Sequence, residues 1–114
     1  MNTMSINNTM FTAKMPTRIN IKTKNPAMQK NAEDYFCSLI DLRKERANKL
    51  VNMLDYLNKS VNLYFRGNEV NVGKKTNAVY INADGPKTSR FDFEQAKDGE
   101  NLLDAIIKNI NLNV

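Results

Sequence analysis

Apolar and polar residues alternate with a period of two through four short runs between Val61 and Phe93. Because successive side chains of a β-strand point to opposite faces of a sheet, each run predicts a strand with one apolar face and one polar face. We expect these strands, which form an antiparallel meander, at residues 61–66, 69–73, 77–82 and 88–94. The apolar set, which we expect to be buried, comprises Val61, Leu63, Phe65, Val70, Val72, Val79, Ile81, Phe91 and Phe93.

Residues 26–58 follow a different period, with apolar side chains at spacings of three and four that predict one long amphipathic helix. Asn25 and Pro26 suit its start, because asparagine caps free backbone amides and proline is tolerated at the first helical position. Such a helix would be roughly 50 Å long, whereas a domain of this size is only about 27 Å across. We therefore expect either a break near Asn31, where a second start is possible, or an overhang that pairs with another copy to give a homodimer.

The N-terminal residues divide into two parts at Pro16. Residues 1–16 show neither a helical nor a strand period and predict a disordered basic arm. Residues 17–23 alternate and predict a strand in which Ile19 and Ile21 point into the core. The folded domain is therefore expected to begin with this strand.

A final helix completes the pattern, because an apolar stripe runs from Leu102 to Ile110. Asp98 is its predicted N-cap. The whole pattern predicts one α+β domain over residues 17–114. Its expected elements are an N-terminal strand, a long amphipathic helix, a four-stranded antiparallel meander and a C-terminal helix, with the helices on one face of the sheet.

The composition of the chain excludes most catalytic chemistry. The chain contains no histidine and a single cysteine, Cys37, which excludes structural zinc sites, histidine-based acid–base catalysis and an internal disulfide. Cys37 lies in an apolar stretch, where we expect an inert core residue. Asp92, Glu94 and Lys97 lack the spacing of metal-dependent nucleases, and no Gly-Lys-Ser/Thr sequence precedes a helix. We therefore expect neither an enzyme nor a cofactor nor a metal site.

Targeting signals are equally sparse in the sequence. No run of apolar residues is long enough to span a membrane, and the N-terminus lacks the apolar block of a secretory signal. A lone cysteine suits a reducing compartment. We therefore expect a cytoplasmic protein with no membrane partner.

The formal net charge of +5 comes from the N-terminal quarter of the chain. Residues 1–30 contain no acidic side chain and five basic ones: Lys14, Arg18, Lys22, Lys24 and Lys30. Such a segment attracts phosphate through a sequence-independent, salt-sensitive interaction, although simple solubility explains the charge equally well. We expect Arg18 and Lys22 to contact nucleic acid, together with Lys74 and Lys75 at the tip of a predicted hairpin.

The polar face of the predicted meander carries side chains that suit nucleic acids. Tyr64 and Tyr80 can stack on bases, each contributing about 1–3 kcal/mol. Arg66 and Arg90 share the face of the tyrosines and can hold phosphates. Tyrosine is also common in solvated strands, and tyrosine and arginine are both favoured at protein interfaces, so these two alternatives stay open.

In its order of elements, residues 61–112 resemble a unit of the PUR and whirly families. A meander that ends in Ser89-Arg90-Phe91-Asp92-Phe93 is followed at once by an amphipathic helix, as in the strand-meander-plus-helix unit of those families. The resemblance implies binding of single-stranded nucleic acid and assembly by pairing of such units. We therefore expect a small non-catalytic nucleic-acid-binding protein. The alternative is a phage or mobile-element accessory protein that binds and inhibits a larger host protein complex.

Overall fold

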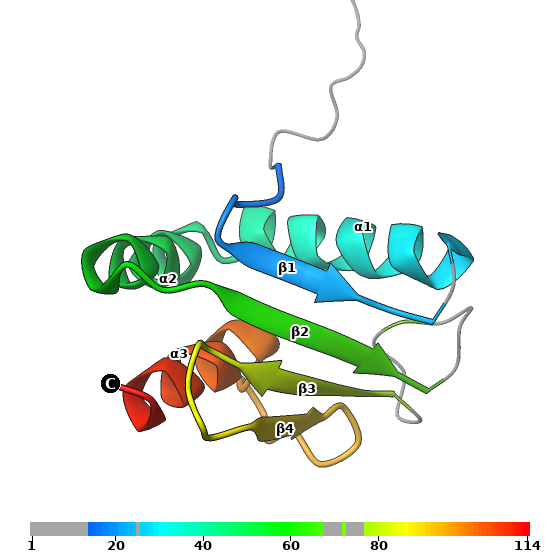
Figure 1. Ribbon diagram of the computed structural model, residues 1–114. Coiled ribbons are helices and arrows are strands. Elements are labelled where there is room, and N and C mark those ends of the chain that lie inside the picture. Colours follow the sequence, from blue (N-terminus) through cyan, green and yellow to red (C-terminus); the bar gives the residue numbers. More distant parts are fainter. Residues whose placement is uncertain (1–13, 25, 68–71, 73–76) are drawn as a thin grey trace, which may run out of the picture.

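The fold is α+β, as the sequence predicts, with a four-stranded sheet and three helices (Figure 1). The computed structural model describes residues 14–24, 26–67, 72 and 77–114. In chain order the elements are β1 (Ile19–Lys22), α1 (Pro26–Leu42), α2 (Lys44–Leu57), β2 (Val61–Arg66), β3 (Ala78–Asn82), β4 (Ser89–Asp92) and α3 (Leu102–Leu112). Within the described part of the chain, no helix is long and apolar enough to cross a membrane.

The sheet is mixed rather than wholly antiparallel. Its strand order is β1-β2-β3-β4, in which β2, β3 and β4 form an antiparallel meander and β1 pairs with β2 in parallel. Parallel neighbours need a crossover connection, and α1 and α2 together provide it between β1 and β2. The strand predicted at 69–73 lies outside the described residues, apart from Val72. The described sheet therefore reaches four strands by including β1: the meander is confirmed for β2, β3 and β4, and the strand predicted at 69–73 is not tested.

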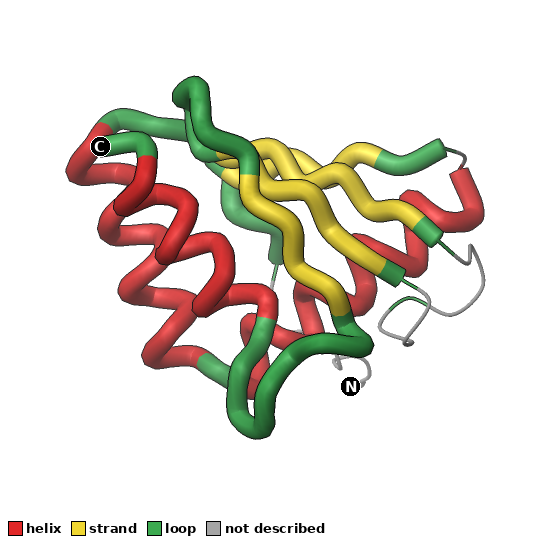
Figure 2. The backbone as a smooth tube through the Cα atoms, turned by 90° about the horizontal axis from the view of Figure 1, so that it is seen from below, coloured by secondary structure: helices red, strands yellow, loops and turns green. Residues whose placement is uncertain are grey.

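All three helices lie on one side of the sheet, and the core fills the space between the two layers (Figure 2). α3 packs against β3, β4 and α2, while α1 packs against β1. Burial is confirmed for six of the alternating residues: Val61, Leu63, Phe65, Val79, Ile81 and Phe91. Phe93 follows the end of β4 and is only half-buried, with its ring edge-on to those of Tyr35 and Phe91. Val72 is also half-buried, and Val70 lies outside the described residues.

The segment predicted as one long helix is two helices, which Arg43 separates. The backbone of Arg43 has φ −127° and ψ 57°, outside the helical range, and no side chain in the described part of the molecule caps the start of α2. After this break Ala47, Leu50 and Leu54 are buried in the same core as the residues of α1. Asn31 lies within α1, so the predicted position of the break was wrong. Because each of the two helices is short enough for one small domain, helix length no longer favours a homodimer.

α3 begins with a capping box at Asn101 rather than at the predicted Asp98. The Asn101 side chain accepts the backbone N–H of Asp104, and the Asp104 carboxylate accepts the backbone N–H of Asn101. This reciprocal pair satisfies two backbone amides that the first turn leaves free. Asp98 lies in the turn before the helix. The cap lies at Asn101 because the apolar stripe starts with the very next residue, Leu102.

Asn109, a buried polar residue of α3, fixes the connection between β3 and β4. Its Oδ1 accepts the backbone N–H of Ala83 at 2.8 Å, and its Nδ2 donates to the Lys87 carbonyl at 3.1 Å and to Ser89 Oγ at 2.8 Å. One turn later, Asn113 accepts the Lys87 N–H at 2.9 Å and donates to the Lys87 carbonyl at 2.9 Å. The two side chains therefore hold the connection against the C-terminal half of α3.

Candidate nucleic-acid interface

The open face of the sheet carries a row of four side chains, one from each strand. Strand register places Lys22 opposite Tyr64, Tyr64 opposite Tyr80, and Tyr80 opposite Arg90. Arg66 lies next to this row, two residues after Tyr64 on β2. The alternation of the sequence places these residues on one face, and the register brings them into lateral contact range.

Tyr80 is held by arginines from both neighbouring strands. The guanidinium carbons of Arg66 and Arg90 lie 5.7 and 5.4 Å from the centre of its ring, within cation–π range. Arg90 Nη1 also donates to the Tyr80 hydroxyl at 2.9 Å, and Arg90 Nε donates to Asp92 at 2.9 Å. The hydrogen bond and the negative charge of Asp92 raise the pKa of the Arg90 guanidinium. Tyr80 therefore positions two cations, and its own ring is less available for stacking than the sequence predicts.

Tyr64 differs from Tyr80, although both lie in the same row. Its side chain is exposed, at 39%, and forms no hydrogen bond or ring contact with any described residue. A hollow of about 240 Å³ lies beside it, lined by Lys22, Thr23, Lys24, Phe65 and Arg66 as well as Tyr64. Among the described residues, this lining contains three cations and no carboxylate. Within the described residues none of these cations forms an ion pair, so their charges are free to meet an anion.

Lys24 is a member of this hollow that sequence reasoning did not select. It follows Lys22 by two residues, just beyond the end of β1, and is exposed. The alternation that predicts the strand would have placed Lys24 on the same face as Lys22. The alternation in the sequence is therefore sufficient to predict the position of Lys24.

Arg18 lies away from the hollow. Its Nε forms an ion pair with Asp55 at 3.0 Å, its Nη2 donates to Asn58 Oδ1 at 3.1 Å, and its Nη1 donates to the Lys59 carbonyl at 3.3 Å. These bonds hold the residue before β1 to the C-terminal end of α2. Its partners lie 37 to 41 residues away in sequence, so no local pattern could identify them. The other two predicted contacts, Lys74 and Lys75, lie outside the described residues.

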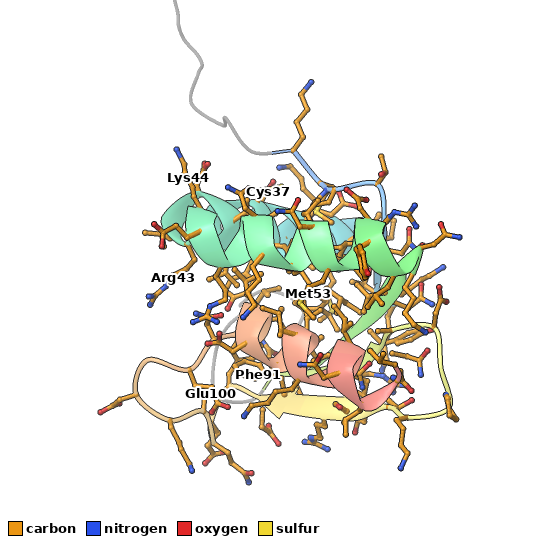
Figure 3. The ribbon with its side chains drawn as sticks, turned by 90° about the vertical axis from the view of Figure 1, so that its left-hand side faces the viewer. Cys37, Arg43, Lys44, Met53, Phe91 and Glu100 are labelled. Atoms are coloured by element: carbon orange, nitrogen blue, oxygen red, sulfur yellow. The ribbon has the colours of Figure 1, made fainter. Side chains whose placement is uncertain are left out.

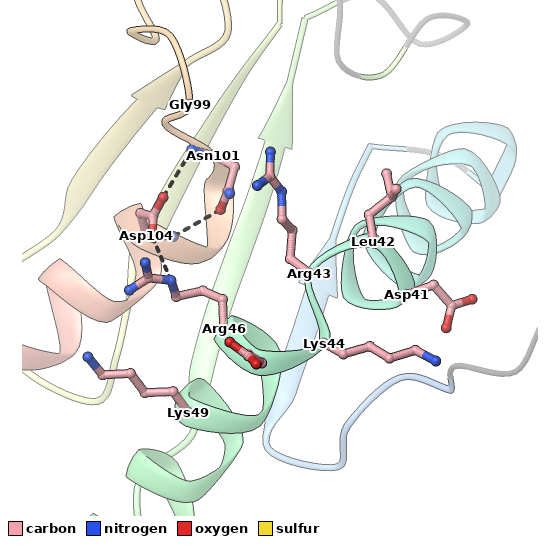
Figure 4. Close-up of a pocket in the computed structure, with 10 residues that line it drawn as sticks. Asp41, Leu42, Arg43, Lys44, Arg46, Lys49, Gly99, Asn101 and Asp104 are labelled. Atoms are coloured by element: carbon pink, nitrogen blue, oxygen red, sulfur yellow. Dashed lines mark hydrogen bonds and ion pairs between the residues drawn. The ribbon is translucent and has the colours of Figure 1, made fainter.

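A larger cavity lies elsewhere, where the α1–α2 junction meets the start of α3 (Figure 4). It measures about 640 Å³ and is open to solvent. Its charged lining mixes both signs: Arg43, Lys44, Arg46, Lys49, Asp41, Glu45 and Asp104. Arg46 is already paired with Asp104 at 3.2 Å. Size alone would favour this cavity, but its mixed charge gives no preference for an anion, unlike the hollow beside Tyr64.

Cys37 is half-buried on α1 rather than fully buried as expected (Figure 3). Burial raises the pKa of its thiol, and the nearby carboxylates of Asp34, Glu33 and Asp41 raise it further. The thiol is therefore protonated at neutral pH, which is the unreactive form. Among the described residues, no group of three or more cysteine and acidic side chains is placed to hold a metal ion.

Comparison with protein-family models, with curated proteins and with solved structures finds no significant match. The resemblance in element order to the PUR and whirly families therefore stays a prediction, and the chemistry of the open face has to be judged on its own geometry.

Proposed function

We propose that the open face of the sheet binds single-stranded nucleic acid without catalysis. Tyr64 stacks on a base, and Lys22, Lys24 and Arg66 neutralise the adjoining phosphates. The observation that carries this proposal is the exposed ring of Tyr64, which has no partner among the described residues, beside three cations that form no ion pair with any described carboxylate. Arg90, held by Tyr80 and Asp92, extends the charged surface to the far strand.

Two features favour a single strand over other anionic ligands. Bases in a duplex are stacked on their neighbours, whereas those of a single strand are free to stack on an exposed aromatic ring. The hollow, at about 240 Å³, is below the range of about 300–1,000 Å³ usual for pockets that enclose a small molecule. An extended polymer that crosses the face needs no enclosure. A reducing compartment such as the cytoplasm suits the lone Cys37.

The test is a titration of short labelled oligonucleotides, single-stranded and duplex, followed by fluorescence anisotropy at low salt. We expect the single strand to bind more tightly, and Tyr64→Ala to weaken its binding by about 1–3 kcal/mol. Tyr56→Ala is the matched control, since Tyr56 is 89% exposed on α2 in the helix layer. Absence of binding at micromolar protein, or equal effects of the two substitutions, would overturn the proposal.

A protein partner is the second candidate, and exposed apolar side chains on the helix layer favour it. Leu42, at the end of α1, is 79% exposed, and Tyr56 of α2 is 89% exposed. The accessory-protein alternative predicts that Leu42→Ser and Tyr56→Ala reduce capture of one stoichiometric protein from nuclease-treated host lysate. Tyr64→Ala should leave that capture unchanged.

A further inference from the structure

The two edges of the sheet differ in how their backbone groups are used. On β1, the outward N–H of Ile19 donates to the Pro16 carbonyl at 3.2 Å. The outward carbonyl of Ile21 accepts the side chain of Gln29, from α1, at 2.9 Å. These bonds occupy two of the outward backbone groups of β1.

At the β4 edge, fewer of the outward backbone groups have a partner among the described residues. The Phe93 N–H donates to the Asn77 carbonyl at 3.3 Å, which makes Phe93 and Asn77 a hydrogen-bonded pair in the antiparallel ladder. Because such pairs alternate along a strand, Phe91 also faces β3, whereas the backbone groups of Arg90 and Asp92 face outward. No described residue pairs with β4 on this side. The Asp92 carbonyl accepts one bond, from the Gln95 N–H at 3.1 Å, and keeps a second lone pair.

We propose that two copies of the chain pair through this edge, with their β4 strands antiparallel and Phe91 at the two-fold axis. In this register Arg90 of each copy lies opposite Asp92 of the other. The outward backbone groups of the two residues then meet as hydrogen-bonded pairs. Shifting the register by one pairing step in either direction would place Arg90 opposite Arg90, or Asp92 opposite Asp92. Opposite charges across a strand pair stabilise it and like charges destabilise it, so charge selects the register centred on Phe91.

The surroundings of the edge leave room for a second copy. A hollow of about 490 Å³ runs between β4 and α3, and Phe91, Ala105 and Leu112 are part of its apolar lining. Figure 3 shows Phe91 and Glu100, both of which line the hollow, beside α3. Leu112 is 57% exposed. Side chains of a paired β4 on this side would enter the hollow and cover Leu112.

Such a pair joins two four-stranded sheets into one and makes their polar faces continuous. The interface differs from the one that helix length suggested, because it uses the sheet edge and leaves α1 and α2 free. Its charges also allow a test that separates pairing between copies from any effect on the fold.

The experiment is sedimentation velocity over a concentration series, without nucleic acid, on the full chain and on Arg90→Asp and Asp92→Arg. We expect the native chain to dimerise, and each variant alone to dimerise about tenfold more weakly or worse, because two favourable cross-strand pairs become unfavourable. An equimolar mixture of the two variants should recover the native affinity, since both pairs in the mixed dimer again have opposite charges. The double variant Arg90→Asp/Asp92→Arg should likewise dimerise as the native chain does.

Lys44→Asp is the control, because Lys44 is an exposed cation at the start of α2, in the helix layer. It should leave the dimer unchanged. A native chain that stays monomeric up to its solubility limit would overturn the proposal. So would a mixture that dimerises no better than either variant alone, including the case in which a variant has lost its fold.

Discussion

The two tyrosines on the open face of the sheet differ in their contacts, although they are the same type of residue. Tyr64 and Tyr80 occupy equivalent positions in one row, yet only Tyr64 is without a partner among the described residues. The difference arises because Arg66 and Arg90, from strands on either side, both reach Tyr80. Alternation in the sequence could predict the shared face but not which ring is free.

The contacts of a single side chain also matter in the core, where we expect the hydrogen bonds of the buried Asn109 to contribute to the free energy of unfolding. Asn109→Leu keeps the size of the side chain and leaves the Ala83 N–H and the Ser89 hydroxyl without their partner. We expect a loss of about 2 kcal/mol or more in the free energy of unfolding, measured with urea. An unsatisfied buried N–H costs about 1–3 kcal/mol, and the part-buried Ser89 hydroxyl adds to this loss. The exposed Asn111→Leu on the same helix should change the free energy of unfolding by less than about 0.5 kcal/mol. Equal effects at the two positions would show that the Asn109 bonds contribute little.

At the scale of elements, period and alternation predicted most of the structure, and their failures have identifiable causes. The strands at Val61–Arg66 and Ala78–Asn82 follow directly from alternation. The break at Arg43 does not, because neither proline nor glycine marks it and it forms to bring α2 back onto the core. The parallel pairing of β1 with β2 depends on the direction in which α1 and α2 return the chain to the sheet, and no local sequence pattern predicts that direction. Alternation placed Arg66 and Arg90 on the face of the tyrosines, whereas neither the role of Lys24 nor the bonds of Arg18 to α2 were predicted.

The start of α3 offers a test between two candidate caps. Asn101→Ala removes the side chain that accepts the Asp104 N–H, and we expect it to cost about 1 kcal/mol of stability in urea unfolding. Asp98→Ala, at the position that the sequence favoured, should have an effect near zero. The reverse order would show that the helix starts earlier in solution.

For the whole molecule, the distribution of charge predicts how binding should respond to salt. Lys22→Ala and Lys24→Ala should each reduce the slope of log affinity against log salt concentration by about 0.7, the value for one phosphate contact on a single strand. Lys30→Ala is the matched control, because Lys30 lies on α1 and is paired with Asp34 at 2.9 Å. Anisotropy titrations at several salt concentrations measure all three slopes. Identical slopes for the native chain and the Lys22 and Lys24 variants would exclude these lysines as phosphate contacts.

The hydrogen bonds from Asn109 and Asn113 to the β3–β4 connection also affect when the chain can fold during its synthesis. β3 and β4 precede α3 in sequence, yet α3 covers their apolar face and holds their connection in place. While the chain emerges from the ribosome, we therefore expect the apolar face of β3 and β4 to lack the cover of α3 until that helix has been synthesised. We therefore expect folding of the domain to be completed only after α3 has been synthesised. A nascent chain stalled before residue 102 should remain sensitive to protease throughout.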